Sequence, residues 1–227
     1  MIWVVVILVV VGLIFLPGLW VRQVMRRYSE PRDRYPGTGG QFASHLLKRL
    51  GMGHVGVERT DQGDHYDPVA KVVRLTPDKF DGRSLTAVTV AAHEVGHALQ
   101  DYQGYTPLTL RTRLVAVAAR GEKLAAVLLM TLPVLAILSR SPTAAFLIPL
   151  AIIGSVGLST IVHLLTLPTE MDASFQRALP LLQQGEYLKE GDLPHARKLL
   201  KAAALTYVSA SLMSLLNLGR WLAILRR

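Results

Sequence analysis

The stretch SLTAVTVAAHEVGHALQ, residues 84–100, decides how the rest of this chain is arranged. Ser84 can accept a hydrogen bond from the first turn of a helix, as N-cap serines commonly do. Apolar residues then recur at helical spacing, at Leu85, Val88, Ala92, Val95 and Leu99. The pattern predicts one helix with an apolar face against a core. Neighbouring elements can approach this helix closely because it has small residues at Ala91, Ala92, Gly96 and Ala98.

The same helix carries the pattern H-E-x-x-H, from His93 to His97. Two histidines four residues apart project from one helical face, which suits two neutral imidazoles that bind one tetrahedral zinc ion. Glu94 then lies beside the metal, where its carboxylate can take a proton from a metal-activated water and pass it to a leaving amine. Because the chain has no cysteine, every side-chain ligand must be His, Asp or Glu. The motif therefore predicts Zn2+ as the cofactor and Glu94 as the catalytic base.

Apolar stretches elsewhere predict a membrane protein. Residues 2–20 carry no charge and are long enough, as a helix, to cross a hydrocarbon core of roughly 30 Å. Residues 124–138 and 144–167 flank a short turn and predict a transmembrane hairpin. Residues 202–225 include Tyr207, Asn217 and Arg220, so this stretch is either a span or an interfacial helix.

The net charge of +9 raises the possibility of nucleic-acid binding, and the positions of the charges argue against it. The basic residues crowd directly after the first apolar stretch, without interleaved aromatic residues, at Arg22, Arg26, Arg27, Arg32 and Arg34. The positive-inside rule places such a cluster on the cytoplasmic face, beside anionic lipid. We therefore expect a lipid bilayer as a partner and no nucleic acid.

These patterns predict a mainly α fold: a polytopic α-helical membrane protein with a small α+β, zincin-like catalytic insertion. The predicted segments are a transmembrane helix at 1–21, a cytoplasmic catalytic domain at 22–115 and a transmembrane hairpin at 116–167. Cytoplasmic helices with the third metal ligand follow at 168–201, and a transmembrane or interfacial helix at 202–227. The active site is expected on the cytoplasmic side of a bacterial inner membrane.

The polar domain contains a second predicted helix and two predicted strands. Residues 37–50 have apolar residues at helical spacing, whereas 55–57 and 71–75 are β-branched and bounded by turn residues at 61–68. A peptide substrate is predicted to pair with the strand at 71–75, contacting Val72, Val73 and Arg74, unless that strand only closes the domain's own sheet. His65, in the turn-rich stretch, is a candidate to stabilise an oxyanion.

A catalytic zinc usually takes three protein ligands and a water, so His93 and His97 need a third partner that is not Cys and lies on the same side of the membrane. The candidates are Glu122, Glu170, Asp172, Glu186 and Glu190. Two predicted spans separate the H-E-x-x-H helix from Glu170 and Asp172, so these two return to the same side of the membrane. They point about 200° apart on a helix, and only one of them can face the metal. The other is expected to orient an imidazole or cap a helix, with Arg177 as its ion-pair partner.

Five stretches of the chain resemble the YugP-like neutral zinc metallopeptidases of bacterial membranes: GDHYDP at 63–68, KVVRL at 71–75, AAHEVGHA at 91–98, LPTEMDAS at 167–174 and ALTYV at 204–208. The chain is more distantly similar to the HtpX and CAAX prenyl protease group. The resemblance implies that Glu170 is the third zinc ligand. In those distant relatives an Asp stands four residues after this Glu, whereas Asp172 stands two residues after Glu170. Tyr207 joins Asp172, His65 and Arg177 as candidates to support the site or its transition state.

The combined reading is an integral membrane zinc endopeptidase that cleaves protein or peptide substrates, with a possible role in membrane protein quality control. The expected partners also include a second copy of this chain, in a homo-oligomer, or another membrane protein. The alternative is a non-catalytic, zinc-containing membrane scaffold or adaptor. Glu94 favours the enzyme, because a structural zinc site is closed by its ligands and needs no base beside the metal.

Overall fold

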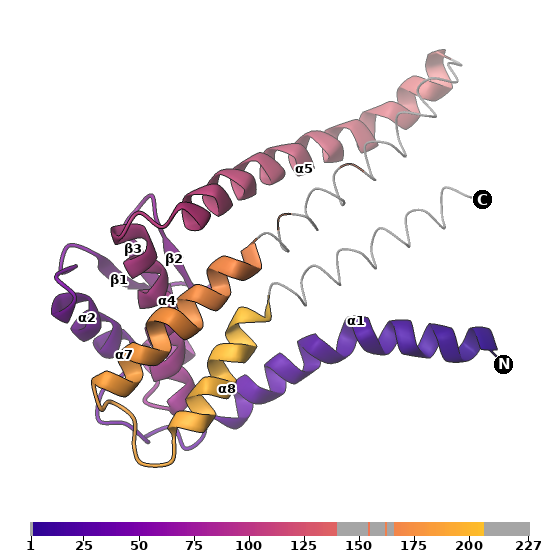
Figure 1. Cartoon of the computed structure of the whole chain (residues 1–227). Helices are drawn as coiled ribbons and strands as arrows, with labels where there is room; N and C mark the ends of the chain where they lie inside the picture. The colour runs from indigo at the N-terminus through magenta and orange to yellow at the C-terminus, as the bar shows by residue number, and fades with distance from the viewer. Residues whose placement is uncertain (1, 140–153, 155–161, 163–165, 207–227) are drawn as a thin grey trace. The chain divides into compact units, whose positions relative to one another are not determined.

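The computed structural model describes residues 2–139, 154, 162 and 166–206 (Figure 1). The chain forms two compact units. One comprises residues 1–18, 110–166 and 207–227, and the other comprises residues 19–109 and 167–206. The second unit contains the described β-sheet and the H-E-x-x-H helix.

Two long helices each run across the boundary between the units: α1, Ile2–Arg27, and α5, Thr106–Ser139. Among the helices in the described part of the chain, none combines the length and apolar character needed to cross a membrane. In α5, for example, the apolar character of the part before residue 124 is interrupted by basic residues, at Arg111, Arg113, Arg120 and Lys123. The uncharged remainder, 124–139, is shorter than the roughly 20 residues of a typical span.

The prediction of a polytopic membrane fold is therefore wrong, and the described chain is mainly helical with a small sheet. The predicted span at 1–21 falls in α1, mostly on residues whose side chains lie outside the described set. Most of the second arm of the predicted hairpin and nearly all of the predicted helix at 202–227 also lie outside the described residues. The predicted segment boundaries stay a prediction.

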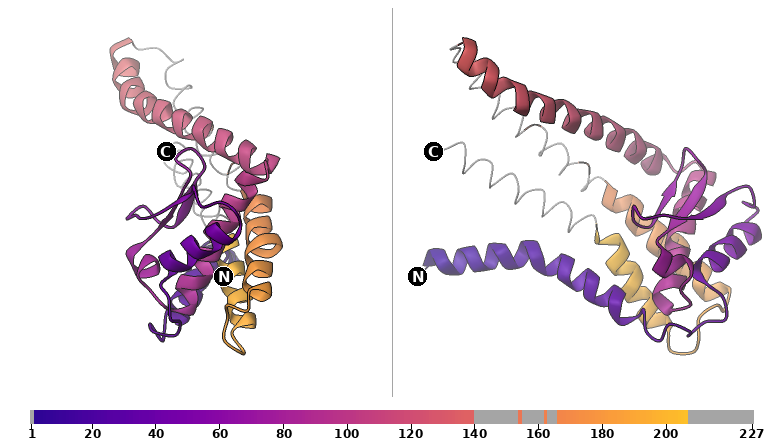
Figure 2. Two further views of the ribbon diagram at one scale, coloured as in Figure 1. Left: turned by 90° about the vertical axis from the view of Figure 1, so that its left-hand side faces the viewer. Right: turned by 180° about the vertical axis from the view of Figure 1, so that it is seen from behind.

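Helix α4, Leu85–Tyr102, is the centre of the second unit, and the other elements pack around it (Figures 1 and 2). Ser84 caps it as predicted, because its hydroxyl accepts a hydrogen bond from the Ala87 amide at 3.2 Å. Nearly every α4 residue from Leu85 to Ala98 is buried. The helical elements that surround it are α2, Gly39–Arg49; α3, Pro77–Phe80; the π-helix η1, Asp172–Ala178; α7, Leu179–Gln184; and α8, Leu193–Ala204.

Helix α2 confirms the helix predicted at 37–50. Thr38 and Gln41 form a capping box at its start, in which each side chain satisfies the backbone amide of the other. Ala43, Leu46 and Leu47 form its buried face. This face packs against α4, so α2 covers one side of the helix that carries the histidines.

The sheet has three strands in the order β1-β3-β2. Strand β1, Gly56–Arg59, pairs in parallel with β3, Val72–Leu75, whereas β2, His65–Asp67, pairs antiparallel with β3. Strands were predicted at 55–57 and 71–75, the places of β1 and β3. Strand β2 was not, because a three-residue strand with one apolar residue shows no alternation. Tyr66 in β2 is buried, and its hydroxyl donates to Asp101 at 2.6 Å near the end of α4.

The strand that contains Val72, Val73 and Arg74 lies at the centre of the described sheet and closes the domain's own sheet. Val73 pairs with Val57 on one side and with Tyr66 on the other. A central strand has no free backbone groups for a third partner. The open edges of this sheet therefore belong to β1 and β2.

Asp192 fastens the chain after α1 to the start of α8. Asp192 is only 2% exposed. Its carboxylate accepts hydrogen bonds from Arg34 Nε at 2.6 Å, from Arg34 Nη2 at 2.5 Å and from the Tyr35 hydroxyl at 2.6 Å. Burial alone would raise the pKa of Asp192, but the hydrogen bonds from Arg34 and Tyr35 outweigh it and lower the pKa below its usual 3.8. Asp192 thus links residues 158 positions apart in the sequence.

Asp192→Ala is expected to lower the free energy of unfolding by roughly 1–3 kcal/mol, because the buried Tyr35 hydroxyl loses the carboxylate to which it donates. The lowered pKa means that this stabilisation is complete above pH about 4 and is lost as the pH falls through the folded-state pKa. Denaturant unfolding at several pH values measures both effects. The exposed neighbour Asp33→Ala is the control and should change stability by less than about 0.5 kcal/mol. An equal loss in both variants would contradict the assignment.

Candidate metal centre

His93, His97 and Glu170 converge in the core of the second unit. His93 and His97 project from α4, and Glu170 lies in the helical residues 167–171 that lead into η1. Their exposed fractions are 4%, 3% and 1%. One potential ligand atom from each lies within 4.8 Å of the others, which is a spacing that one metal ion can bridge.

The two imidazoles direct the same ring nitrogen at the same carboxylate oxygen. Glu170 Oε2 lies 3.2 Å from His93 Nε2 and 3.3 Å from His97 Nε2. The rings meet edge to face, with centroids 4.8 Å apart. The structure thus places these three predicted ligands together, while Asp172 points elsewhere.

The outer nitrogen of each imidazole contacts a neutral polar side chain. His97 Nδ1 lies 2.9 Å from Gln100 Oε1, and His93 Nδ1 lies 3.0 Å from the Ser174 hydroxyl. Sequence reasoning missed both residues. The available signals were spacing alone: Gln100 lies three residues after His97 on α4, and Ser174 lies four residues after Glu170.

Asp172 contacts the site through Gln100 rather than through the three ligand residues. Gln100 Nε2 donates to Asp172 Oδ2 at 2.7 Å and to the Thr169 carbonyl at 2.8 Å. Arg177 Nε donates to Asp172 Oδ2 at 2.6 Å, so the predicted ion pair between these two residues is present. Arg177 also lies over the ring of Tyr105 at 5.3 Å and bonds Gln103.

Gly96 allows the two ligand-bearing segments to meet. A Cβ atom at this position would lie 2.7 Å from the carbonyl oxygen of Ala173 in η1. Because that neighbour is backbone, it cannot move aside as a side chain can. The glycine between the two histidines therefore sets the distance between α4 and the segment that carries Glu170 and Ser174.

The remaining predicted site residues fall in different places. Glu94 lies on α4 between the histidines and is 5% exposed. His65 lies on β2, where its Nδ1 contacts the Gly63 carbonyl at 2.8 Å, and it is not part of the group formed by the three ligand residues. Tyr207 lies outside the described residues.

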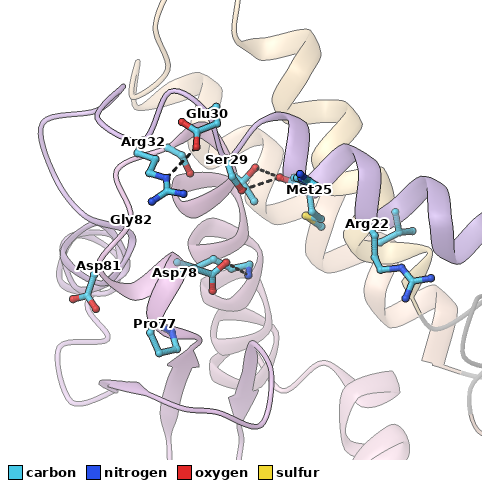
Figure 3. A pocket seen from close by; sticks show the side chains of 14 residues that line it. Arg22, Met25, Ser29, Glu30, Arg32, Pro77, Asp78, Asp81 and Gly82 are labelled. Atoms are coloured by element: carbon cyan, nitrogen blue, oxygen red, sulfur yellow. Dashed lines mark hydrogen bonds and ion pairs between the residues drawn. The ribbon is translucent and has the colours of Figure 1, made fainter.

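A separate cavity of about 890 Å³ lies beside the C-terminal part of α1 and the start of α4 (Figure 3). Its walls include Arg22 and Met25 from α1 and Asp78 and Gly82 from the chain before α4. Figure 3 shows the ion pair between Arg32 and Glu30 at its margin. None of the three converging residues lines this cavity, so it is distinct from the candidate metal centre.

A buried His-His-Glu group on an H-E-x-x-H helix is typical of zinc peptidases. The comparisons with known proteins agree. Residues 2–226 match the family described as "Putative neutral zinc metallopeptidase". The chain is 36% identical over 215 residues to a Bacillus subtilis (strain 168) protein named "Putative membrane protease YugP", covering 94% of this chain and 92% of the relative.

The chain therefore belongs to the neutral zinc metallopeptidase family, which confirms the YugP-like resemblance found in its sequence. No solved structure matches the chain.

Proposed function

We propose that this protein hydrolyses peptide bonds with a zinc ion held by His93, His97 and Glu170. The convergence of these three side chains carries the proposal. Their donor set fits zinc, which binds imidazole nitrogen and carboxylate oxygen and commonly takes three protein ligands in catalytic sites. Membership of a zinc metallopeptidase family gives independent support.

The hydrogen bonds around the imidazoles strengthen the case for a cation. Gln100 Oε1 can only accept, so His97 Nδ1 must donate, and in the neutral imidazole its Nε2 keeps a lone pair. The Ser174 hydroxyl donates to the Leu200 carbonyl at 3.2 Å, which leaves its oxygen to accept from His93 Nδ1. Two nitrogen lone pairs and a carboxylate oxygen then face one another in a buried place. A single cation among them would bind all three acceptor atoms.

The proposed mechanism assigns the proton transfers to Glu94. When bound, zinc supplies Lewis acidity, polarising the scissile carbonyl and lowering the pKa of an attacking water. Glu94, placed between the two histidines on α4, takes the proton of that water and later delivers it to the leaving amine. Its burial in the core keeps bulk water away from this transfer.

We propose that an extended peptide substrate adds to the outer edge of β2. Among the described residues this strand pairs with β3 alone, and the bond from Tyr66 to Asp101 holds it against the end of α4. Edge pairing would satisfy the backbone of the peptide and leave its side chains free for selection. His65, at the start of β2, would then lie beside the substrate rather than beside the metal.

The name of the Bacillus relative supports a further proposal, that the protein works at a bacterial membrane. Four expectations stay predictions: contact with the bilayer, a homo-oligomer or membrane protein partner, a role in quality control, and the absence of nucleic-acid binding.

The third ligand is tested by comparing Glu170→Ala with Asp172→Ala. Glu170→Ala is expected to weaken zinc binding by at least about 100-fold, because it removes one of three protein ligands. Asp172→Ala should cost roughly 10-fold, because it acts on His97 only through Gln100. Zinc affinity of the purified chain, measured by competition with a chelator, separates the two. The reverse order would assign the ligand role to Asp172.

A further inference from the structure

We propose that Gln100 and Ser174 are positioning residues that hold both imidazoles with the proton on Nδ1 and the Nε2 lone pair toward the metal position. The proposal rests on the zinc site proposed above. It assigns a role to two residues that neither the motif nor the family match identifies. The chemistry of the terminal groups fixes the direction of each hydrogen bond around the two imidazoles.

The first chain of hydrogen bonds begins at Arg177. A guanidinium can only donate, and an ionised carboxylate can only accept. Asp172 therefore accepts from Arg177 Nε at 2.6 Å and also from Gln100 Nε2 at 2.7 Å. The same amide nitrogen of Gln100 donates its second hydrogen to the Thr169 carbonyl oxygen at 2.8 Å.

The carbonyl oxygen of Gln100 is then the only group of this side chain that faces His97. It lies 2.9 Å from His97 Nδ1, so the nitrogen must carry the proton. Gln100 is 0% exposed, and water cannot offer the amide an alternative arrangement. A charge near the surface thus determines, through two side chains, which nitrogen of His97 is free for the metal.

The second chain of hydrogen bonds begins at a backbone carbonyl. The oxygen of Leu200 in α8 can only accept, and the Ser174 hydroxyl donates to it at 3.2 Å. The hydroxyl has one proton, so at His93 it acts as the acceptor at 3.0 Å. Ser174 is 0% exposed as well. His93 is thereby held in the same tautomer as His97.

Both series of hydrogen bonds keep the Nε2 atom of an imidazole free of a proton, because a ligand imidazole must present a lone pair to the metal. Hydrogen bonds to the outer nitrogen fix the tautomer and the ring orientation, and losing them typically costs 10–100-fold in metal affinity. Gln100 also ties α4 to the Thr169 carbonyl, next to Glu170. It therefore positions two ligands, whereas Ser174 positions one.

The test uses the full chain and measures two quantities, the tautomers of His93 and His97 and the affinity for zinc. Nitrogen-15 NMR of the metal-free protein at pH about 8, where unperturbed imidazoles are neutral, identifies the protonated nitrogen of His93 and His97. The wild type is expected to show Nδ1–H at both. Gln100→Met should disturb this state at His97 only, Ser174→Ala at His93 only, and each should weaken zinc binding 10–100-fold.

Matched controls use the same substitutions elsewhere. Gln183 is an exposed residue of α7 and Ser44 lies on α2, so Gln183→Met and Ser44→Ala should each leave zinc affinity within about twofold. A stricter test is the pair Gln100→Glu and Asp172→Asn. Gln100→Glu alone sets two carboxylates against each other, whereas the double variant restores a donor between Arg177 and position 100. It should recover at least about tenfold of the lost affinity.

Two results would overturn the proposal: an Nε2–H tautomer at either histidine in the wild type, or zinc affinity within twofold of wild type in both Gln100→Met and Ser174→Ala. The wild-type tautomers decide the question even where a variant does not fold. Failure of the proposed function has a different signature, since a chain that binds no zinc or cleaves no peptide can still show Nδ1–H at both histidines.

Discussion

Glu94→Gln is expected to abolish peptide hydrolysis while leaving zinc in place. The amide cannot accept the proton of the attacking water, and both histidines and Glu170 are untouched. Loss of a general base typically costs 10²–10⁴-fold in rate. The measurement is casein cleavage by the purified chain, together with zinc content, for the wild type and the variant.

The control for this substitution is Glu58→Gln, an exposed glutamate of β1 whose side chain is 57% exposed. It should keep full activity. Wild-type turnover in Glu94→Gln would disprove the general-base role, and joint loss of zinc and activity would make Glu94 a structural residue. A wild type that binds zinc but cleaves nothing would favour the non-catalytic scaffold.

Gly96→Ala is expected to disable the metal centre without changing a ligand. The added Cβ would meet the Ala173 carbonyl oxygen at 2.7 Å, so η1 must move away from α4. Such overpacking costs roughly 1–3 kcal/mol in stability. Because the helical residues before η1 carry Glu170, we expect zinc affinity to fall at least about 30-fold, a loss of about 2 kcal/mol in binding.

A second helical glycine provides the comparison. At Gly12 in α1, the contact that a Cβ would make with the described residues is an ordinary one, with the Leu16 side chain at 3.5 Å. Gly12→Ala should therefore retain wild-type zinc affinity and gain slightly in helix stability. Chelator competition and thermal unfolding on both variants separate a local displacement from general unfolding. Unchanged zinc affinity in Gly96→Ala would show that the close approach of η1 is not needed for the site.

The sequence predicted the parts of this site that follow a repeating pattern. The helix around His93 was predicted from its period and its Ser84 cap, because both signals are local. Glu170 was harder, since no local pattern links it to α4, and the choice over Asp172 needed a family resemblance. The structure places Glu170 at the histidines and Asp172 at Gln100.

Other features could not be read from a local pattern. Gln100 and Ser174 are single polar residues in helices, and only the fold shows that their side chains face imidazoles. Strand β2 has too few residues to alternate, so β3 was given a free edge that it does not have. The membrane fold was predicted from apolar stretches and from the basic residues beside them, and neither signal says how a helix packs.

The distance along the chain between the ligands has a consequence for biosynthesis. Glu170 follows His97 by 73 positions, and a ribosome that adds 5–20 residues per second needs roughly 4–15 seconds to make that segment. During this interval the nascent chain has both histidines but lacks the carboxylate and the serine that complete the site. For the proposed zinc site, this order means that all three ligands are present only after the C-terminal third has emerged, so the proposed activity would begin only when synthesis is nearly complete.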